Sequence, residues 1–183
     1  MTVQTPDRYD VVGSFLRPEK LKQARKDYEA KKISKEELTK VEDACITDLI
    51  QKEKAAGLHV ITDGEFRRAT WHLDFMWGFD GVSHTPTKTG LPFHGEAAMI
   101  DDTYITGKVG VNGTHPFVEH FKFVKQFEDE NTIAKQTIPA PAQFLEQMIL
   151  PFALENTRKY YEDTEELVQD IANGYKVVIQ QLY

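Results

Sequence analysis

Paired cysteines, long apolar runs and an excess of basic side chains are all missing from this sequence of 183 residues. Its single cysteine, Cys45, cannot form an internal disulfide, and a thiolate-rich zinc site needs at least two such residues. No apolar run reaches the roughly 18 residues of a membrane span, so we expect no membrane partner. The formal net charge of −7 argues against binding to nucleic-acid phosphates, so we expect no nucleic-acid partner either.

Several motifs with a well-understood chemistry are missing as well. The sequence contains no P-loop, no G-x-G-x-x-G and no G-x-S-x-G pattern, and its histidines form no H-x-x-x-H pair. The first residues of the chain lack the basic and then apolar pattern of a secretory signal. We therefore expect a cytoplasmic protein with no metal site among its own residues.

The sequence does contain enough apolar residues for a folded core, because 40% of it is hydrophobic and 11% aromatic. Its strands are predicted to alternate with helices, which is typical of an α/β protein with parallel strands. A capping box at Ser34 and Glu37 begins one helix, and Gly57 ends it. Residues 83–100 lack periodicity and are interpreted as an irregular insertion. The predicted strands are 9–14, 58–63, 104–111 and 132–138, and the predicted helices are 18–32, 34–57, one from Pro116 and one from Asp163.

The first candidate site follows the first predicted strand. Val12, Gly13 and Ser14 offer backbone N–H groups and a hydroxyl, which together can bind an anionic group such as a carboxylate. The alternative is an ordinary turn that ends a strand. Residue types alone leave both interpretations open.

The second candidate site, residues 63–68, directly follows the second predicted strand. It places two carboxylates beside two guanidinium groups, so Glu65 could bind an ammonium while one of the arginines binds a carboxylate. The alternative is a solvated charged loop with internal ion pairs. Loops that follow strands carry functional residues often enough for both interpretations to be kept.

Further candidates flank these two sites. Trp71 belongs to an aromatic cluster that could stack on a flat heterocycle, although such clusters are more often part of a core. His72 is the histidine best placed for a ligand contact. The Pro139-Ala140-Pro141 segment forms either a rigid wall beside a ligand or a stiff connection to a helix. Cys45 lies on the apolar stripe of its helix and is interpreted as a core residue.

Together these segments resemble the cobalamin-independent methionine synthase family, and most closely its short members, which contain only the catalytic barrel. The resemblance rests on Val-Val-Gly-Ser-Phe at 11–15, on Ile-Thr-Asp-Gly-Glu-Phe-Arg-Arg at 61–68 and on the Pro-Ala-Pro segment. It runs in order over nearly the whole chain, and the run from Asp63 to Trp71 is its most specific part.

The resemblance implies a (β/α)8 TIM-type barrel and methyl transfer from a 5-methyltetrahydrofolate-type donor to the thiol of homocysteine, which gives methionine. By this resemblance, Val12-Gly13-Ser14 and Glu65 match the homocysteine-binding positions of the family. Residues near Arg67 and Trp71 would shape the substrate and donor clefts. The substrate-binding residues we predict are Val12, Gly13, Ser14, Glu65, Arg67, Trp71 and His72. Their catalytic partners are not predicted.

The family holds zinc through a His-x-Cys pair, a glutamate and a second cysteine, and this chain lacks that pair. A complete barrel takes about 250 residues or more. We therefore expect residues 1–183 to be a single partial domain, the N-terminal half of a barrel, whose last helix ends uncapped at Tyr183. Such a fragment should be inactive by itself.

Two alternatives remain beside that interpretation. One is a related barrel enzyme that acts on another thiol or on a tetrapyrrole. The other is a non-catalytic binding or assembly module, because the open sheet edges of half a barrel favour self-association.

Overall fold

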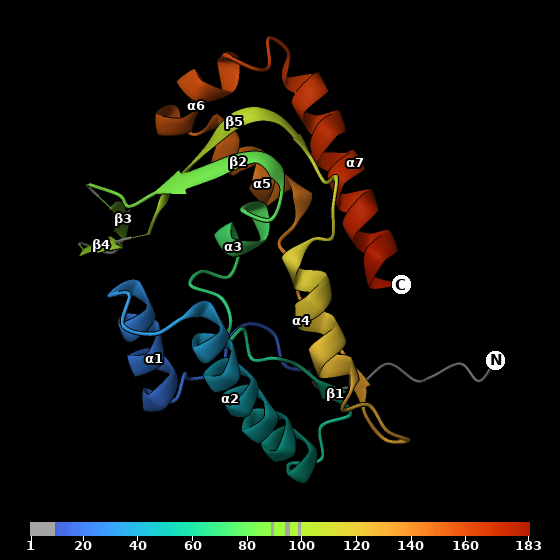
Figure 1. The fold of residues 1–183 in the computed structure, drawn as a ribbon. Helices are drawn as coiled ribbons and strands as arrows, with labels where there is room; N and C mark the ends of the chain where they lie inside the picture. Colours follow the sequence, from blue (N-terminus) through green and yellow to red (C-terminus); the bar gives the residue numbers. More distant parts are fainter. Residues whose placement is uncertain (1–9, 89, 94–95, 99) are drawn as a thin grey trace, which may run out of the picture. The chain divides into compact units, whose positions relative to one another are not determined.

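The computed structural model describes residues 10–88, 90–93, 96–98 and 100–183 (Figure 1). The chain forms two compact units. The first unit consists of Met1–Arg68 and His120–Thr137, and the second of Ala69–Glu119 and Ile138–Tyr183. The chain therefore leaves the first unit after Arg68 and returns to it within one helix, α4 (Pro116–Lys125).

Two helices, one of them capped by side chains, and one parallel strand pair build the first unit. The Ser34 hydroxyl accepts a hydrogen bond from the Glu37 N–H, and the Glu37 carboxylate accepts one from the Ser34 N–H, so the predicted capping box is confirmed. Strands β1 and β6 pair in parallel, with Val60 opposite Ile133. The elements are α1 (Glu19–Glu29), α2 (Lys35–Ala55), β1 (Val60–Ile61) and β6 (Ile133–Ala134).

The core of the first unit lies between these helices and the parallel pair. Residues of α2 at helical spacing turn one face inward, where they meet side chains from α1, β1 and α4. Cys45 is fully buried among them, as predicted, and burial raises the pKa of its thiol. The buried cluster is Leu21, Cys45, Ile46, Leu49, Ile50, Ile61, Phe66 and Val124.

The second unit is built around an antiparallel strand pair. Strands β2 and β5 pair with a bulge between Asp80 and Val82, and α7 lies against β5 (Figure 1). Gly81 permits this bulge because it has φ +75° and a Cβ there would lie 2.3 Å from the Lys108 carbonyl oxygen. The elements are α3 (Leu73–Met76), β2 (Asp80–Thr85), β3 (Leu91–Phe93), β4 (Glu96–Ala98), β5 (Asp102–Gly110), α5 (Pro141–Ile149), α6 (Pro151–Arg158) and α7 (Thr164–Leu182).

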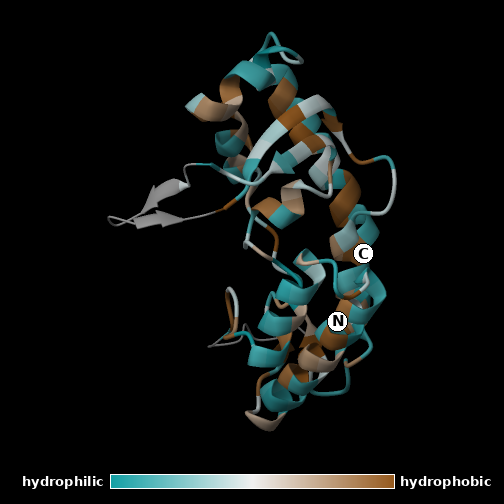
Figure 2. Ribbon diagram, turned by 60° about the vertical axis from the view of Figure 1, so that its left-hand side comes forward, coloured by the Kyte–Doolittle hydropathy of each residue, from teal (hydrophilic) through white to brown (hydrophobic). Residues whose placement is uncertain are grey.

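Aromatic rings fill the core of the second unit. The Phe75 ring lies 4.6 Å from the His115 ring and 5.1 Å from the Tyr175 ring, measured between centroids. A Cβ on Gly174 would lie 2.4 Å from the Phe79 ring, so only a glycine at this position lets α7 pack so closely against that ring. Figure 2 shows hydrophilic and hydrophobic bands along the helices of both units, as expected for amphipathic helices.

The structure corrects several predictions about strands. Residues 10–14 form no strand, and Gly13 has a left-handed backbone with φ +85°. The strands predicted at 58–63 and 132–138 are only two residues long each. The strand predicted at 104–111 exists as β5, but it pairs antiparallel with β2 and adds nothing to a parallel sheet. The mixed α/β class is therefore confirmed, whereas the half-barrel stays a prediction.

The structure also bears on the predicted insertion, on two helices that begin with proline and on membrane-spanning segments. The insertion near 83–100 contains strand segments and lies partly outside the described residues. Helix α5 begins at Pro141, which agrees with the alternative that the Pro139-Ala140-Pro141 segment leads into a helix. Helix α6 was not predicted, although the proline in its first turn is a common signal of a helix start. No helix in the described part combines the length and apolar character needed to cross a bilayer.

Candidate functional site

The turn after β1 has an unusual backbone. Gly64 and Glu65 both have left-handed conformations, with φ +61° and φ +57°. A left-handed backbone is strained for a residue with a side chain and persists only where the surroundings hold it. Here the Asp63 carboxylate accepts the Glu65 N–H at 2.8 Å, and the Thr62 hydroxyl accepts the Gly64 N–H at 3.1 Å. The turn thus holds Glu65 in one orientation.

The Glu65 carboxylate is buried, with only 6% of the residue exposed, and one of its oxygens is fully engaged. Its Oε1 accepts hydrogen bonds from Arg68 Nη1 at 3.1 Å and from the Thr137 hydroxyl at 3.2 Å. Oε2 has no hydrogen-bond partner among the described residues, and it is not sealed from solvent. One carboxylate oxygen is therefore available to a ligand.

The segment around Ser14 is attached to this turn. The Phe15 N–H donates to the Gly64 carbonyl at 3.2 Å, and Arg17 Nη2 donates to the Glu65 carbonyl at 3.1 Å. Lys135 holds the segment from the other side through the Asp10 carboxylate and the Val11 carbonyl, and it lowers the pKa of Asp10. The two segments that the family resemblance assigns to homocysteine binding are therefore joined by hydrogen bonds.

Both Val12 and Ser14 are exposed, and Val12 has 84% of its surface free. Gly13, between them, is half-buried. The three residues are therefore accessible to a small molecule beside the turn that carries Glu65.

Two more carboxylates lie behind the same turn. Glu53 on α2 accepts hydrogen bonds from the Thr62 N–H and hydroxyl, each at 3.2 Å. Burial raises the pKa of Glu53 to about 6, and the nearby Asp63 carboxylate adds to that rise. Asp63 Oδ2 is buried and has no hydrogen-bond partner among the described residues. The loop at 63–68 is therefore buried and not solvated, whereas the internal ion pair that this alternative expected is present between Arg68 and Glu65.

Arg67 and Arg68 have different partners although they are adjacent. The Arg67 guanidinium pairs with Glu42, at 3.3 Å, and with Asp43, and it lies 5.0 Å from the centre of the Phe123 ring. Its contribution to substrate binding stays a prediction. Arg68, which is 1% exposed, is the arginine that contacts Glu65, and the sequence prediction missed it. The Glu65-x-x-Arg68 spacing was a signal, because side chains three apart meet across one turn.

Trp71 and His72 belong to the second unit, whereas Glu65 belongs to the first. Their rings lie 4.3 Å apart, and Trp71 is 51% exposed. Burial lowers the pKa of His72, which precedes α3. Their substrate contacts stay predictions. Phe75 and Phe79 are core residues, as the alternative interpretation held.

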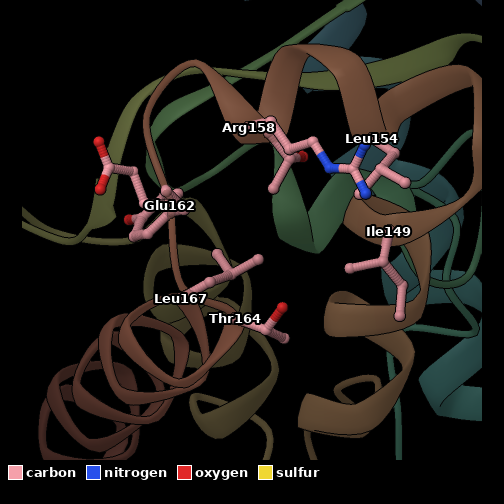
Figure 3. A pocket seen from close by; sticks show the side chains of 8 residues that line it. Ile149, Leu154, Arg158, Glu162, Thr164 and Leu167 are labelled. Atoms are coloured by element: carbon pink, nitrogen blue, oxygen red, sulfur yellow. The ribbon is translucent and has the colours of Figure 1, made fainter.

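The second unit also encloses a cavity of about 160 Å³ between α5, α6 and α7 (Figure 3). Figure 3 shows Ile149 and Leu167 on opposite sides of this cavity. None of the residues predicted to bind substrate lines it. The cavity is lined by Ile149, Leu154, Thr157, Arg158, Tyr161, Glu162, Thr164 and Leu167.

A zinc ion of the kind the family resemblance implies does not fit the residues described. No group of three His, Cys, Asp or Glu side chains suited to a metal occurs in the described part of the chain. Cys45, the single cysteine of the chain, is fully buried among apolar side chains in the core of the first unit. We therefore derive no chemical step through a metal.

Sequence comparison relates the chain to known proteins. Residues 9–87 match the family model described as the catalytic domain of cobalamin-independent synthase. The chain is 36% identical to the protein YxjH of Bacillus subtilis over 180 residues, which cover 98% of this chain and 46% of that protein. It is 25% identical to the methionine synthase of Sulfolobus acidocaldarius over 177 residues, 94% of this chain and 46% of that one.

Solved structures share the fold. A Listeria monocytogenes protein assigned as a vitamin-B12-independent methionine synthase is 36% identical, with a TM-score of 0.73 over 97% of this chain and 48% of that one. A B12-independent methionine synthase from Shewanella is 22% identical, with a TM-score of 0.58 over 82% and 40%, and shows the fold alone. The chain thus spans about half the length of its relatives. In sequence and fold it is related, over that half, to the cobalamin-independent methionine synthase family.

Proposed function

We propose that the chain supplies the amino-acid-binding half of a methionine-synthase-type methyltransferase. The acceptor is the thiol of homocysteine, and the methyl donor is of the 5-methyltetrahydrofolate type. The observation that carries this proposal is the buried Glu65 carboxylate, which is held through Oε1 while Oε2 has no hydrogen-bond partner among the described residues. The names of the relatives support the reaction class.

The geometry suits the charged end of an amino acid. Glu65 Oε2 accepts a hydrogen bond from the ligand ammonium, and charge-assisted bonds of this kind are about twice as strong as neutral ones. The Ser14 hydroxyl and the backbone N–H groups beside Gly13 donate to the ligand carboxylate. Because the Phe15–Gly64 hydrogen bond joins the two segments, both ends of the ligand are bound by one rigid part of the unit.

The chemistry at the sulfur requires more than these residues offer. A thiol becomes a strong nucleophile only when it is deprotonated, and a bound metal is one means to achieve this. We propose that the zinc-binding half of a (β/α)8 barrel lies outside residues 1–183, and that these residues alone bind homocysteine without methylating it.

One observation favours a second candidate, an assembly module. Among the described residues, β1 and β6 pair only with each other, so each has an unpaired edge that could accept another strand. Self-association through these edges would show as a mass that increases with concentration in sedimentation experiments. A mass that stays constant at that of one chain would remove this candidate.

Calorimetric titration with L-homocysteine tests the main proposal. Glu65→Gln removes the charge but preserves the shape, and we expect affinity at least about tenfold weaker. Glu128→Gln is the control, because Glu128 is a carboxylate of the first unit that accepts the Ala134 N–H and pairs with Lys125, outside the residues predicted to bind substrate. Equal losses in both variants, or no binding by the unaltered protein, would contradict the proposal.

A further inference from the structure

We propose that Arg68 and Thr137 are positioning residues that give the Glu65 site its selectivity for a primary α-ammonium group. This inference rests on the proposed function and deepens it. Neither residue needs to contact the ligand. Their effect is to fix which oxygen of Glu65 faces it.

The three side chains form a closed ring of hydrogen bonds. Arg68 Nη1 donates to Glu65 Oε1 at 3.1 Å, and Arg68 Nη2 donates to the Thr137 hydroxyl at 2.9 Å. The Thr137 hydroxyl in turn donates to Glu65 Oε1 at 3.2 Å. Arg68 Nη2 also donates to the Thr137 carbonyl at 2.7 Å, so the guanidinium is bound to backbone as well as to side chains. Both donors converge on the same carboxylate oxygen.

The backbone that carries Arg68 is fixed independently of this ring. The Arg68 carbonyl accepts a hydrogen bond from Arg17 Nη2 at 2.9 Å and another from Arg25 Nη1 at 2.7 Å. Two guanidinium groups therefore hold the turn from α1 and from the segment before it. The Arg68 backbone and guanidinium are both held in place, the guanidinium by the Thr137 carbonyl. A rotation of the Glu65 carboxylate would therefore break its hydrogen bonds to Arg68 and Thr137. We call this fixed group of Glu65, Arg68 and Thr137 the clamp.

The clamp has a consequence for ligand choice. A carboxylate that rotates freely can turn either oxygen toward solvent and can accept from many donors. A carboxylate held through Oε1 presents Oε2 in one direction only, so a ligand gains from it only if it places a cationic donor at that point. Selectivity between a ligand with an α-ammonium and the same ligand without it should therefore depend on Arg68 and Thr137.

Two ligands separate this role from a structural one. Homocysteine and 4-mercaptobutanoate differ only by the amino group, and we expect the unaltered protein to bind homocysteine at least about tenfold more tightly. Thr137→Val removes one donor to Oε1 at nearly constant volume, and we expect it to lower that ratio about threefold. Arg68→Lys keeps the charge but loses the planar fork, so its ratio should fall further while a part of the selectivity remains.

The affinity for 4-mercaptobutanoate is the readout that a purely structural role would change. We expect it to stay within about twofold in both variants, because only the contact with the ammonium is lost. Thr47→Val is the control, since the Thr47 hydroxyl donates to a backbone carbonyl on α2 and does not touch Glu65. Equal weakening of both ligands would overturn the inference.

The failure of this inference is distinguishable from the failure of the proposed function. If the unaltered protein does not discriminate between the two ligands, the proposed amino-acid site is wrong. If it does discriminate, and Glu65→Gln abolishes the difference while Thr137→Val and Arg68→Lys preserve it, only the positioning role is wrong.

Discussion

The two units of the chain bury different kinds of side chain. The first unit encloses charged groups at the turn after β1, whereas the second encloses a cluster of aromatic rings around His115. The buried imidazole of His115 is satisfied locally, since Nε2 lies 2.9 Å from the Phe75 carbonyl and Nδ1 accepts the Phe117 N–H at 3.1 Å. In the first unit, Glu65 Oε2 and Asp63 Oδ2 have no such partner among the described residues.

This difference indicates where the chemistry lies. Burying apolar rings stabilises a fold at little cost, but burying a carboxylate costs several kcal/mol unless it is paired. Glu65 is paired with Arg68 through Oε1 alone, and Asp63 Oδ2 has no partner among the described residues, so part of this cost remains in the first unit. The aromatic unit shows that the same chain can build a core without such groups.

The largest loss of stability is expected when the Glu65–Arg68 pair is broken, and it tests whether the first unit depends on buried charge. Arg68→Met leaves the Glu65 carboxylate buried without its cation, and we expect a loss of about 3–5 kcal/mol in the free energy of unfolding. Urea denaturation followed by circular dichroism measures it. A loss below about 1 kcal/mol would show that the pair is no more important than a surface salt bridge.

A comparable test in the second unit concerns packing instead of charge. Gly174→Ala places a Cβ 2.4 Å from the Phe79 ring, so the ring or the helix must shift. We expect a loss of about 1–3 kcal/mol, with no change in affinity for homocysteine. Thermal unfolding and calorimetric titration check the two parts. Weaker ligand binding in this variant would contradict the assignment of the site to the first unit.

The raised pKa of Glu53 predicts a pH dependence in the first unit. Because the folded state raises this pKa from 4.5 to about 6, the protonated carboxyl stabilises the fold below pH 4.5, and that contribution is lost as the pH rises through about 6. The shift corresponds to about 2 kcal/mol. Glu53→Gln should therefore gain stability relative to the unaltered protein between pH 4.5 and 6.5. A difference independent of pH would rule this out.

The smallest expected loss of stability concerns the N-terminal end of α2 in the first unit. Ser34→Ala removes the hydroxyl that caps α2, and we expect about 1 kcal/mol of destabilisation at constant ligand affinity. Denaturant titration measures it. Thr164→Ala provides a control in the first turn of α7, where Asp163 and not Thr164 supplies the cap.

Local signals in the sequence predicted the helices better than the strands. The Ser34–Glu37 capping box and the apolar spacing of α2 lie within one element, and the structure confirms them. Residues 10–14 have a strand-like composition, yet Asp10 and Val11 bond to Lys135, and the next residue, Phe15, donates to the Gly64 carbonyl. Tertiary contacts decide that segment, and composition does not reveal them.

The candidate site shows the same division. Glu65 and Ser14 were chosen because each follows a predicted strand and matches a family motif, and their substrate contacts stay predictions. The contact between Arg68 and Thr137 could not be predicted, because the two residues are 69 positions apart in the chain and nothing in the sequence links them. Arg67 was chosen by resemblance to the family, whereas the structure pairs Arg67 with Glu42 and Asp43, and Arg68 with Glu65.

The central claim is that Glu65 Oε2 receives the ammonium of an amino-acid ligand, and a crystal structure of the protein with L-homocysteine tests it most directly. We predict the ligand nitrogen within about 3.2 Å of Oε2, with its carboxylate beside Ser14. A ligand bound with its ammonium elsewhere, or an Oε2 that faces only solvent when homocysteine is bound, would contradict the claim.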